Sequence, residues 1–403
     1  VPILYFCFNR KACEKNAERH SDRNFLSGEE TKRVESIVDE LIRRFSLEDY
    51  NKLEGLKSLW FSGCAFHHAG MLPAVKEIVE RLFTEGLIKL LFCTETFALG
   101  INMPAKTVIF DELERFNGVD FQYLSTRQYM QMAGRSGRRG MDEKGFVYSL
   151  IIPEATSPKE ILRLFQGKSE KIKSRFFASY SSILTLYNRF GEDALNLFRK
   201  SLGNYGKSED LTSFYEKEED QIKKRIEFLQ HTGFLEGKDL TPKGALAARA
   251  NGYEIQTAEL YYSRSLDQCT PLHMCIVFAG LITEDKKRRL PPPSITFEFP
   301  GEKVVRHLKR EEKKFGIRNT IPEMNFAFAS AVYSWASGST LSEIIDFGIP
   351  EGDLVRVLRM TIQLMRTLAE LIEDPVTIDK LHQGIRLINR DVVDAQAELE
   401  ASV

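Results

Sequence analysis

The stretch VKEIVERLFTEGLIKLLFCT, residues 75–94, contains a helix followed directly by a strand. Its first half places apolar residues at the spacing of one helical face, namely at Val75, Ile78, Val79 and Leu82. Pro73 stands in the first turn of this helix and Gly86 follows its end, as is usual at helix termini. The second half, IKLLFCT, is a mostly apolar run, which is typical of a strand covered on both faces. A helix leading into such a strand is the repeating unit of a parallel sheet.

The same alternation extends over residues 1–152 of the 403-residue chain. Three further apolar runs predict strands in this part: PILYFCF (2–8), KTVIF (106–110) and FVYSLII (146–152). We therefore expect residues 1–152 to form an α/β domain, with a parallel sheet covered by helices on both faces.

The remaining chain is mostly helical in pattern. Residues 222–250 show a helix, a tight hairpin containing glycine (FLEGKDLT) and a second helix, an order typical of a winged helix. A helical linker with one turn is the alternative. Farther on, the polar, proline-rich segment 286–294 (KKRRLPPPS) is expected to be a solvated connector between helices. We expect a winged-helix domain over 153–252 and an all-α helical bundle over 253–403.

Composition excludes few classes of protein. The net charge of −1 produces no overall attraction to nucleic acid or membrane, so such binding requires local patches. No uncharged apolar run approaches the roughly 20 residues that a membrane helix needs. The 6 cysteines lie mostly in apolar segments, which suggests reduced thiols and a cytoplasmic location. Cys269, His273 and Cys275 are close together, but without a second ligand pair we expect no metal site.

The segment QMAGRSGRRG, residues 131–140, contains three arginines with glycines between them. Glycine permits the close approach of another backbone or of a phosphate group. Guanidinium groups bind phosphate oxygens well because they are planar, always charged and bidentate. An arginine-rich surface turn is the alternative, but it would not require the spacing Gln-x-x-Gly-Arg-x-Gly-Arg. The segment therefore indicates a phosphate-facing loop.

Four segments resemble, in the same order, motifs of superfamily 2 helicases in their superkiller-type, exosome-associated DExH form. They are ILYFCFNRKACE (3–14, motif IV), GCAFHHAGMLPAVKEIVERLFTEG (63–86), CTETFALGINMPAKTVIF (93–110, motif V) and QMAGRSGRRG (131–140, motif VI). Downstream, SRFFASYSSILTLYNRF (174–190) resembles the start of the family's winged helix. Residues from about 221 to 400 resemble its helical DSHCT domain.

The resemblance implies a domain order of second RecA-like lobe, winged helix and helical DSHCT (ratchet) domain. Many exosome-associated members insert a long arch into the winged helix. Here only a short polar segment, GNYGKSEDLTSFYE (203–216), stands at that place, so the chain resembles the simpler members without the arch.

On the nucleotide side, the resemblance implies that Arg135 and Arg138 face the γ-phosphate of ATP, with Arg138 as the arginine finger. An arginine in that role stabilises the charge that develops on the transferred phosphoryl group. Gln131 would link the bound nucleotide to the nucleic-acid strand, and Gly100 and Asn102 would approach the nucleotide.

On the nucleic-acid side, the resemblance implies backbone contacts from residues near the strand ends. Hydroxyl and N–H groups there can hold sugar-phosphate without selecting a sequence. These candidates are Arg10, Lys11, His67, His68, Thr94, Glu95 and Thr96. A histidine pair taken singly is more often structural.

Asn117-Gly118 is a strong hairpin signal flanked by Phe116, Phe121 and Tyr123. The family places a hairpin here that can separate the first unpaired bases of a duplex, and aromatic rings suit stacking on bases. The alternative is a surface hairpin whose aromatic side chains cover the sheet.

In the family, one long helix of the DSHCT domain lines the path of the single strand. Glu351–Ile372 is the best match, and Arg356 and Arg359 are its candidate phosphate contacts. Met360 stands where relatives often have another basic residue. The alternative is an amphipathic helix that only packs.

The chain contains no G-x-x-x-x-G-K-[ST] loop and no Asp-Glu-x-His after an apolar run. ATP and Mg²⁺ are therefore expected to be held mainly by an N-terminal RecA-like lobe of the same protein, and this chain alone should not hydrolyse ATP. We expect the C-terminal portion of an ATP-dependent RNA helicase that unwinds 3′-to-5′. The expected partners are RNA, the N-terminal lobe and RNA-degradation machinery. We expect no membrane partner. The alternatives are a non-enzymatic nucleic-acid-binding adaptor and a DNA-repair helicase of the same superfamily.

Overall fold

The computed structural model divides the chain into two compact units. Unit 1 consists of Val1–Lys171, Pro350–Val355 and Asp394–Val403, and unit 2 of Ile172–Ile349 and Arg356–Val393. Each unit is described by itself. The structure describes residues 2–98, 103–116, 120–154, 156–170, 178–199, 212–250, 252–283, 295, 297–318, 320–345 and 348–395.

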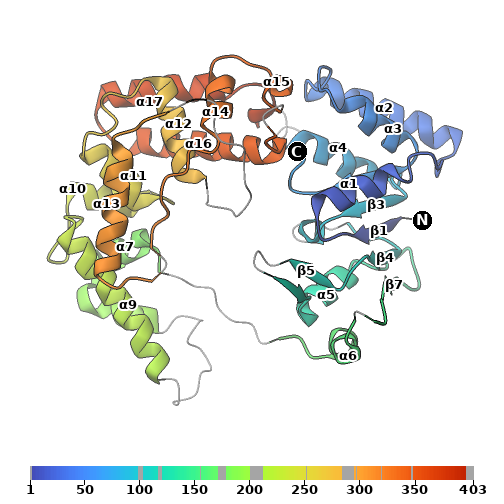
Figure 1. Cartoon of the computed structure of the whole chain (residues 1–403), viewed down its shortest axis with the longest axis horizontal. Coiled ribbons are helices and arrows are strands. Elements are labelled where there is room, and N and C mark those ends of the chain that lie inside the picture. Colours follow the sequence, from blue (N-terminus) through green and yellow to red (C-terminus); the bar gives the residue numbers. More distant parts are fainter. Residues whose placement is uncertain are drawn as a thin grey trace. The chain divides into compact units, whose positions relative to one another are not determined.

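Unit 1 is built on a five-stranded parallel sheet with the order β2-β3-β1-β4-β7 (Figure 1). In the register, Ile3 pairs with Leu90 on one side and with Thr107 on the other. The strands are β1 (Ile3–Phe6), β2 (Cys64–His67), β3 (Leu90–Cys93), β4 (Thr107–Phe110) and β7 (Phe146–Ser149). The predicted RecA-like α/β fold is confirmed.

Helices cover this sheet. Helix α4 begins at Pro73, as predicted, and buries the four apolar residues that the 75–94 stretch places on one face. Helix α5 packs on β4 through Tyr129, whose ring centroid lies 4.7 Å from that of Phe110. The helices are α1 (Arg10–Glu18), α2 (Gly28–Arg44), α3 (Leu53–Phe61), α4 (Pro73–Thr84), α5 (Thr126–Ala133) and α6 (Pro158–Gln166), with the 3₁₀ helix η1 (Glu95–Ala98) after β3.

The prediction that every apolar strand is covered on both faces is wrong for β7. Phe146 is 43% exposed and Tyr148 58% exposed. β7 stands at one edge of the sheet beside β4, and the described elements leave its side chains uncovered, whereas β2 at the other edge is mostly buried. A run of apolar residues does not reveal whether its strand lies inside a sheet or at its edge.

The predicted hairpin is present as β5 (Glu114–Phe116) and β6 (Phe121–Tyr123), which are antiparallel with Phe116 opposite Phe121. Its turn at Asn117-Gly118 lies outside the described residues.

Unit 2 is mostly helical. Its first elements are α7 (Tyr180–Phe190), η2 (Gly191–Asp193), α8 (Ala194–Arg199), α9 (Thr212–His231), the two-stranded hairpin β8 (Leu235–Glu236) and β9 (Asp239–Leu240), and α10 (Pro242–Arg249). The predicted order of helix, hairpin and helix over 222–250 is confirmed. The winged-helix assignment and the boundaries at 152 and 252 stay predictions.

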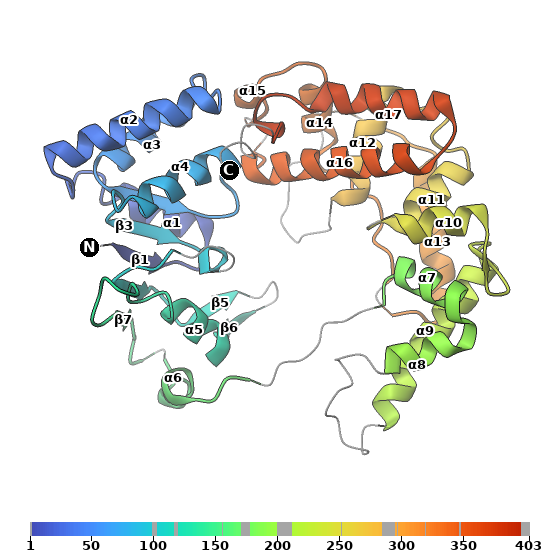
Figure 2. The ribbon, with the colours of Figure 1, turned by 180° about the vertical axis from the view of Figure 1, so that it is seen from behind.

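The rest of unit 2 is a helical bundle around α12, on which α14 and α17 pack (Figure 2). Met274–Ile282 of α12 is buried throughout. The helices are α11 (Glu254–Tyr262), α12 (Pro271–Ile282), α13 (Gly301–Lys314), α14 (Ala329–Ala336), α15 (Leu341–Ile345), α16 (Glu351–Leu371) and α17 (Pro375–Ile388), followed by η4 (Asp391–Val393). The start of α16, up to Val355, belongs to unit 1. The predicted connector 286–294 lies outside the described residues.

Candidate nucleotide-facing and nucleic-acid-facing sites

Helix α5 leads into the arginine-rich loop, and its start is held by two caps. Ser125 and Gln128 form a capping box, in which the Gln128 N–H donates to the Ser125 hydroxyl at 3.1 Å. The carboxylate of Glu170 accepts from the backbone N–H groups of Thr126 at 2.7 Å and Arg127 at 3.1 Å. Orphan N–H groups of the first turn are thereby satisfied, so the helix carrying Gln131 has a fixed start. Gln131 itself is exposed.

The glycines of the loop serve the approach of another backbone. The Gly137 N–H donates to the Ala105 carbonyl at 2.7 Å, and the Ala105 N–H donates to the Arg135 carbonyl at 2.9 Å. Gly137 has a φ of 86°, in the left-handed region that favours glycine. A Cβ on Gly145 would lie 2.5 Å from the Gly137 nitrogen, so the two chain segments touch there. At Gly137 and Gly145 the close approach is therefore that of another backbone, and the phosphate-facing role of the loop stays a prediction.

Both candidate arginines make intramolecular contacts. The Arg135 guanidinium donates to the Ala98 carbonyl. Arg138 donates to the carboxylate of Asp142 through Nε at 2.7 Å and Nη2 at 3.0 Å. The Arg138 guanidinium lowers the pKa of Asp142 to about 2. Arg138 keeps 24% of its side chain exposed, so a phosphate that it binds must compete with Asp142.

The segment that leaves β3 joins the arginine loop to the candidate nucleic-acid contacts. It starts at Thr94, passes Ala98, and reaches Ala105 just ahead of β4. Ala98 and Ala105 both bond the loop, one through the Arg135 side chain and one through backbone. The loop therefore lies at the amino end of β4, whereas Thr94 lies at the carboxyl end of β3. Gly100 and Asn102, within this segment, lie outside the described residues.

At the carboxyl end of β3, the candidates divide into two kinds. The hydroxyl groups of Thr94 and Thr96 lie 2.9 Å apart, and Thr96 is exposed. Glu95 instead pairs with Arg115 of β5, with Nη1 2.5 Å from Oε1 and 2.7 Å from Oε2. Because a carboxylate repels phosphate, Glu95 is better explained as the residue that attaches the β5–β6 hairpin to the strand end.

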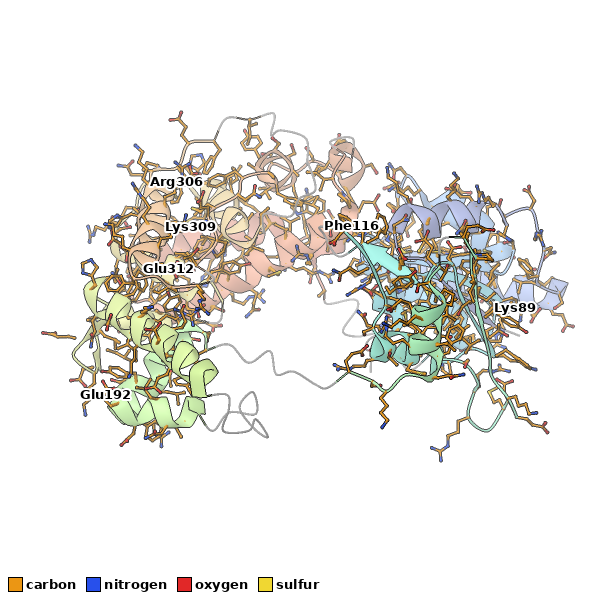
Figure 3. The ribbon with its side chains drawn as sticks, turned by 60° about the horizontal axis from the view of Figure 1, so that its bottom comes forward. Lys89, Phe116, Glu192, Arg306, Lys309 and Glu312 are labelled. Carbon is orange, nitrogen blue, oxygen red and sulfur yellow. The ribbon has the colours of Figure 1, made fainter. Side chains whose placement is uncertain are left out.

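The aromatic residues of the hairpin do not cover the sheet. Phe116, labelled in Figure 3, is 55% exposed and Phe121 66% exposed, and their ring centroids lie 5.5 Å apart. Tyr123 has a different role, since its hydroxyl accepts from the Ser157 N–H at 3.0 Å. An exposed pair of rings favours the base-stacking interpretation over the covering one.

His67 and His68 are buried, with 5% and 3% of their surface exposed. His67 Nε2 lies 2.7 Å from Glu80 Oε1, and His68 Nε2 lies 2.9 Å from Glu14 Oε1. Burial lowers the pKa of His67, so the ring is neutral near pH 7. Both rings are enclosed and paired with carboxylates, which favours a structural role, and their predicted contact with phosphates stays a prediction.

The two basic residues after β1 differ. Arg10 pairs with Asp353, also of unit 1, with Nη1 2.9 Å from Oδ2 and Nη2 3.3 Å from Oδ1. Lys11 is exposed. Of the two, Lys11 is the side chain available to a phosphate.

The arginines of α16 are also engaged. Arg359 donates to the Val393 carbonyl at 2.9 Å and to the Val392 carbonyl at 3.0 Å, which attaches the end of η4 to this helix. The Arg356 Nη1 lies 3.4 Å from the sulfur of Met360 on the same helix. The packing interpretation of Arg359 is the one that these contacts favour.

A pocket of about 570 Å³ lies beside His68 in unit 1, lined among others by Glu14, Tyr50, Lys52 and Glu351. Glu351 is paired within the pocket, since Tyr50 donates to its carboxylate and Lys52 forms an ion pair with it. Of the predicted nucleotide-facing residues that the structure describes, none lines the pocket.

Sequence reasoning missed Asp142, Glu170 and Arg115. Asp142 had a local signal, because an acidic residue four positions after an arginine can pair with it. Glu170 and Arg115 had none, because they stand far along the chain from their partners. In the described part of the chain, no group of three or more His, Cys, Asp or Glu side chains is arranged to hold a metal ion. Likewise, none of the helices in the described ranges is long and apolar enough to span a membrane.

A RecA-like parallel sheet whose arginine loop follows the spacing Gln-x-x-Gly-Arg-x-Gly-Arg defines the second lobe of a superfamily 2 helicase. The helicase conserved C-terminal domain matches residues 31–140, and the DSHCT (NUC185) domain matches residues 237–396. The chain thus contains a helicase C-terminal domain and a DSHCT domain, and it is similar to superkiller-type DExH RNA helicases.

Three curated relatives illustrate the similarity. Exosome RNA helicase MTR4 of Homo sapiens is 43% identical over 187 residues, 46% of this chain and 18% of that protein. The uncharacterized helicase C17H9.02 of Schizosaccharomyces pombe is 39% identical over 213 residues, 52% of this chain and 20% of that protein. The DExH-box ATP-dependent RNA helicase DExH9 of Arabidopsis thaliana is 38% identical over 202 residues, 50% of this chain and 20% of that protein. The matched part thus spans a fifth or less of these relatives.

Proposed function

We propose that this chain is the C-terminal portion of an ATP-dependent RNA helicase that unwinds structured RNA 3′-to-5′ in RNA processing or decay. The names of the relatives support RNA as the substrate, since one is an exosome RNA helicase and another an ATP-dependent RNA helicase. The polarity rests on the family resemblance. RNA-degradation machinery is the partner that the exosome relative suggests. The buried, free state of all six cysteines supports a reducing compartment such as the cytoplasm.

The observation that carries the proposal is the bonding between the arginine loop and the segment that leaves β3. Arg135 bonds Ala98 through its side chain and Ala105 through its carbonyl. A displacement of Arg135 on nucleotide binding would therefore pull on Ala98 and Ala105, which follow Thr94 in the chain. These bonds support coupling between the nucleotide and the nucleic-acid strand. The arginine loop would meet the nucleotide, and the segment after β3, to which the loop is bonded, would meet the strand.

Arg135 and Arg138 suit the triphosphate of ATP, whereas the chain supplies neither the phosphate loop nor the Asp-Glu-x-His carboxylates. ATP and Mg²⁺ are thus proposed ligands held mainly by the N-terminal RecA-like lobe. This chain would orient Arg138 toward the γ-phosphate when the lobes close. When the lobes are closed, the exposed Phe116 and Phe121 would stack on bases at the duplex junction.

Mixing this chain with the separately produced N-terminal lobe tests the proposal. RNA-stimulated ATP hydrolysis that neither part shows alone is the expected result. Tight RNA binding with no hydrolysis in the mixture would instead identify a non-enzymatic adaptor. RNA and DNA strands of one sequence are also compared in competition at one salt concentration. Stronger stimulation of ATP hydrolysis by DNA than by RNA would identify a DNA-repair helicase.

A further inference from the structure

Helix α13 of unit 2 has one face fixed in the protein interior. Val305 and Leu308 are buried, and Glu312 is fully buried. The Glu312 carboxylate accepts from the Tyr180 hydroxyl and from the Ile321 N–H, the latter at 2.7 Å. A buried carboxylate with these partners is costly to displace, so α13 is rigidly attached to the rest of unit 2.

The opposite face of α13 is entirely cationic or polar and faces solvent. At 100° per residue, the exposed residues of this face span an arc of about 120° around the helix axis. The centre of the arc lies opposite Val305, Leu308 and Glu312. Successive turns place these side chains about 5 Å apart along the axis. Figure 3 labels Arg306, Lys309 and Glu312 on this helix. The cationic face of α13 consists of the exposed residues Lys303, Arg306, His307, Arg310, Lys313 and Lys314.

Half of the six side chains on this face have a carboxylate partner among the described residues. Arg306 pairs with Glu302, Lys314 Nζ lies 2.7 Å from Glu311 Oε1, and His307 Nδ1 lies 3.8 Å from the same oxygen. Among the residues that the structure describes, Lys303, Arg310 and Lys313 have no ion-pair partner. Since the whole chain has a net charge of −1, such a concentration of positive charge on one helix is a local feature. A rigid row of unpaired cations attracts a polyanion.

The composition of the face distinguishes between two classes of polyanion. Protein interfaces depend on buried aromatic or large aliphatic anchors and contain little lysine. The cationic face of α13 has no such anchor and contains three lysines. A nucleic-acid backbone, with one charge per about 1.7 Å of duplex axis, needs only cations at regular spacing.

We propose that the cationic face of α13, a helix outside the helicase motifs in sequence, binds the phosphate backbone of RNA. The choice of RNA rests on the proposed function, whereas the recognition of phosphate rests on the charge and exposure of this face. Because Lys303, Arg310 and Lys313 follow one another around successive turns, they would neutralise neighbouring phosphates along one strand. Such contacts hold a strand without reading its sequence.

The test uses this chain alone, without ATP or the N-terminal lobe. Binding of a fluorescein-labelled RNA duplex with a single-stranded overhang is measured by anisotropy between 50 and 200 mM NaCl. The triple variant Lys303→Gln, Arg310→Gln and Lys313→Gln keeps good helix formers on an exposed face. We expect it to bind at least about tenfold more weakly at 100 mM salt, with the slope of log K against log salt reduced by about 2 to 3.

The matched control replaces three exposed cations of another helix, α2, by Gln: Lys32, Arg43 and Arg44. This control should bind RNA with the affinity and slope of the unaltered chain, and circular dichroism should show both variants folded. Equal binding by the two variants would overturn the proposal. It would also be overturned if a poly-glutamate peptide of equal charge displaced the RNA more effectively than unlabelled RNA, because the face would then bind acidic proteins. Neither result requires ATP hydrolysis, so failure here is distinguishable from failure of the proposed function.

Discussion

The guanidinium of Arg138 forms a two-point ion pair with the carboxylate of Asp142, with Nε 2.7 Å from Oδ2 and Nη2 3.0 Å from Oδ1. The Arg138 N–H also donates to Oδ2 at 3.0 Å. Asp142 thus binds both the side chain and the backbone of the candidate arginine finger. In a closed helicase the γ-phosphate would replace this carboxylate as the partner of the guanidinium, while the backbone bond could remain.

Replacing Arg138 by Ala should reduce RNA-stimulated ATP hydrolysis by about 10³- to 10⁵-fold in the mixture with the N-terminal lobe, because the charge on the transferred phosphoryl group loses its partner. The measurement is the steady-state hydrolysis rate at saturating RNA. Arg139→Ala is the matched control, since Arg139 is the exposed neighbour of the same type. Equal losses in the two variants would contradict the finger assignment.

The ion pair of Asp142 also predicts a pH dependence of stability. The pKa of Asp142 is lowered to about 2 in the folded chain, chiefly by its hydrogen bond to Arg138, from an ordinary 3.8. The stabilisation is therefore complete above about pH 4 and lost as the pH falls toward 2. Asp142→Asn should lower the melting temperature at pH 7, and its difference from the unaltered chain should shrink between pH 4 and pH 2. A difference that stays constant with pH would show that the charge is unimportant.

Lys11 and His68 should respond differently to substitution. Lys11→Gln should reduce the salt slope of RNA binding by about 1, as expected when one phosphate contact is lost. His68→Gln should leave that slope unchanged but lower the melting temperature, because His68 is buried and bonded to Glu14 at 2.9 Å. Anisotropy titrations and thermal denaturation measure the two effects. A slope that changed with His68→Gln at unchanged stability would restore the phosphate-contact hypothesis.

The exposed rings of the β5–β6 hairpin should contribute to duplex opening. With both Phe116 and Phe121 changed to Ala, unwinding of a duplex with a 3′ overhang by the two-part enzyme should slow by about 5- to 150-fold. This range follows from about 1 to 3 kcal/mol for the stacking of one base. RNA-stimulated ATP hydrolysis should change much less. Tyr333→Ala removes an aromatic side chain that is 44% exposed elsewhere in the chain and serves as the control. Unimpaired unwinding would support a hairpin without a wedge function.

The sequence alone determined the elements whose signals are local. The 3.6-residue spacing of Val75, Ile78, Val79 and Leu82, together with Pro73, predicted α4 with the correct start and buried face. The spacing of Gln131, Arg135 and Arg138 was one of four motifs that carried the family resemblance, because a motif is a property of neighbouring residues.

The tertiary structure decided which partners these residues have. Glu95 meets Arg115 and His67 meets Glu80 only because the sheet and the helices on it bring separate segments together. The same applies to β7, whose apolar run is identical in pattern to a buried strand but stands at the edge of the sheet. Burial and pairing depend on contacts between segments that are distant in the chain, and hydrophobic periodicity within one segment has no information about them.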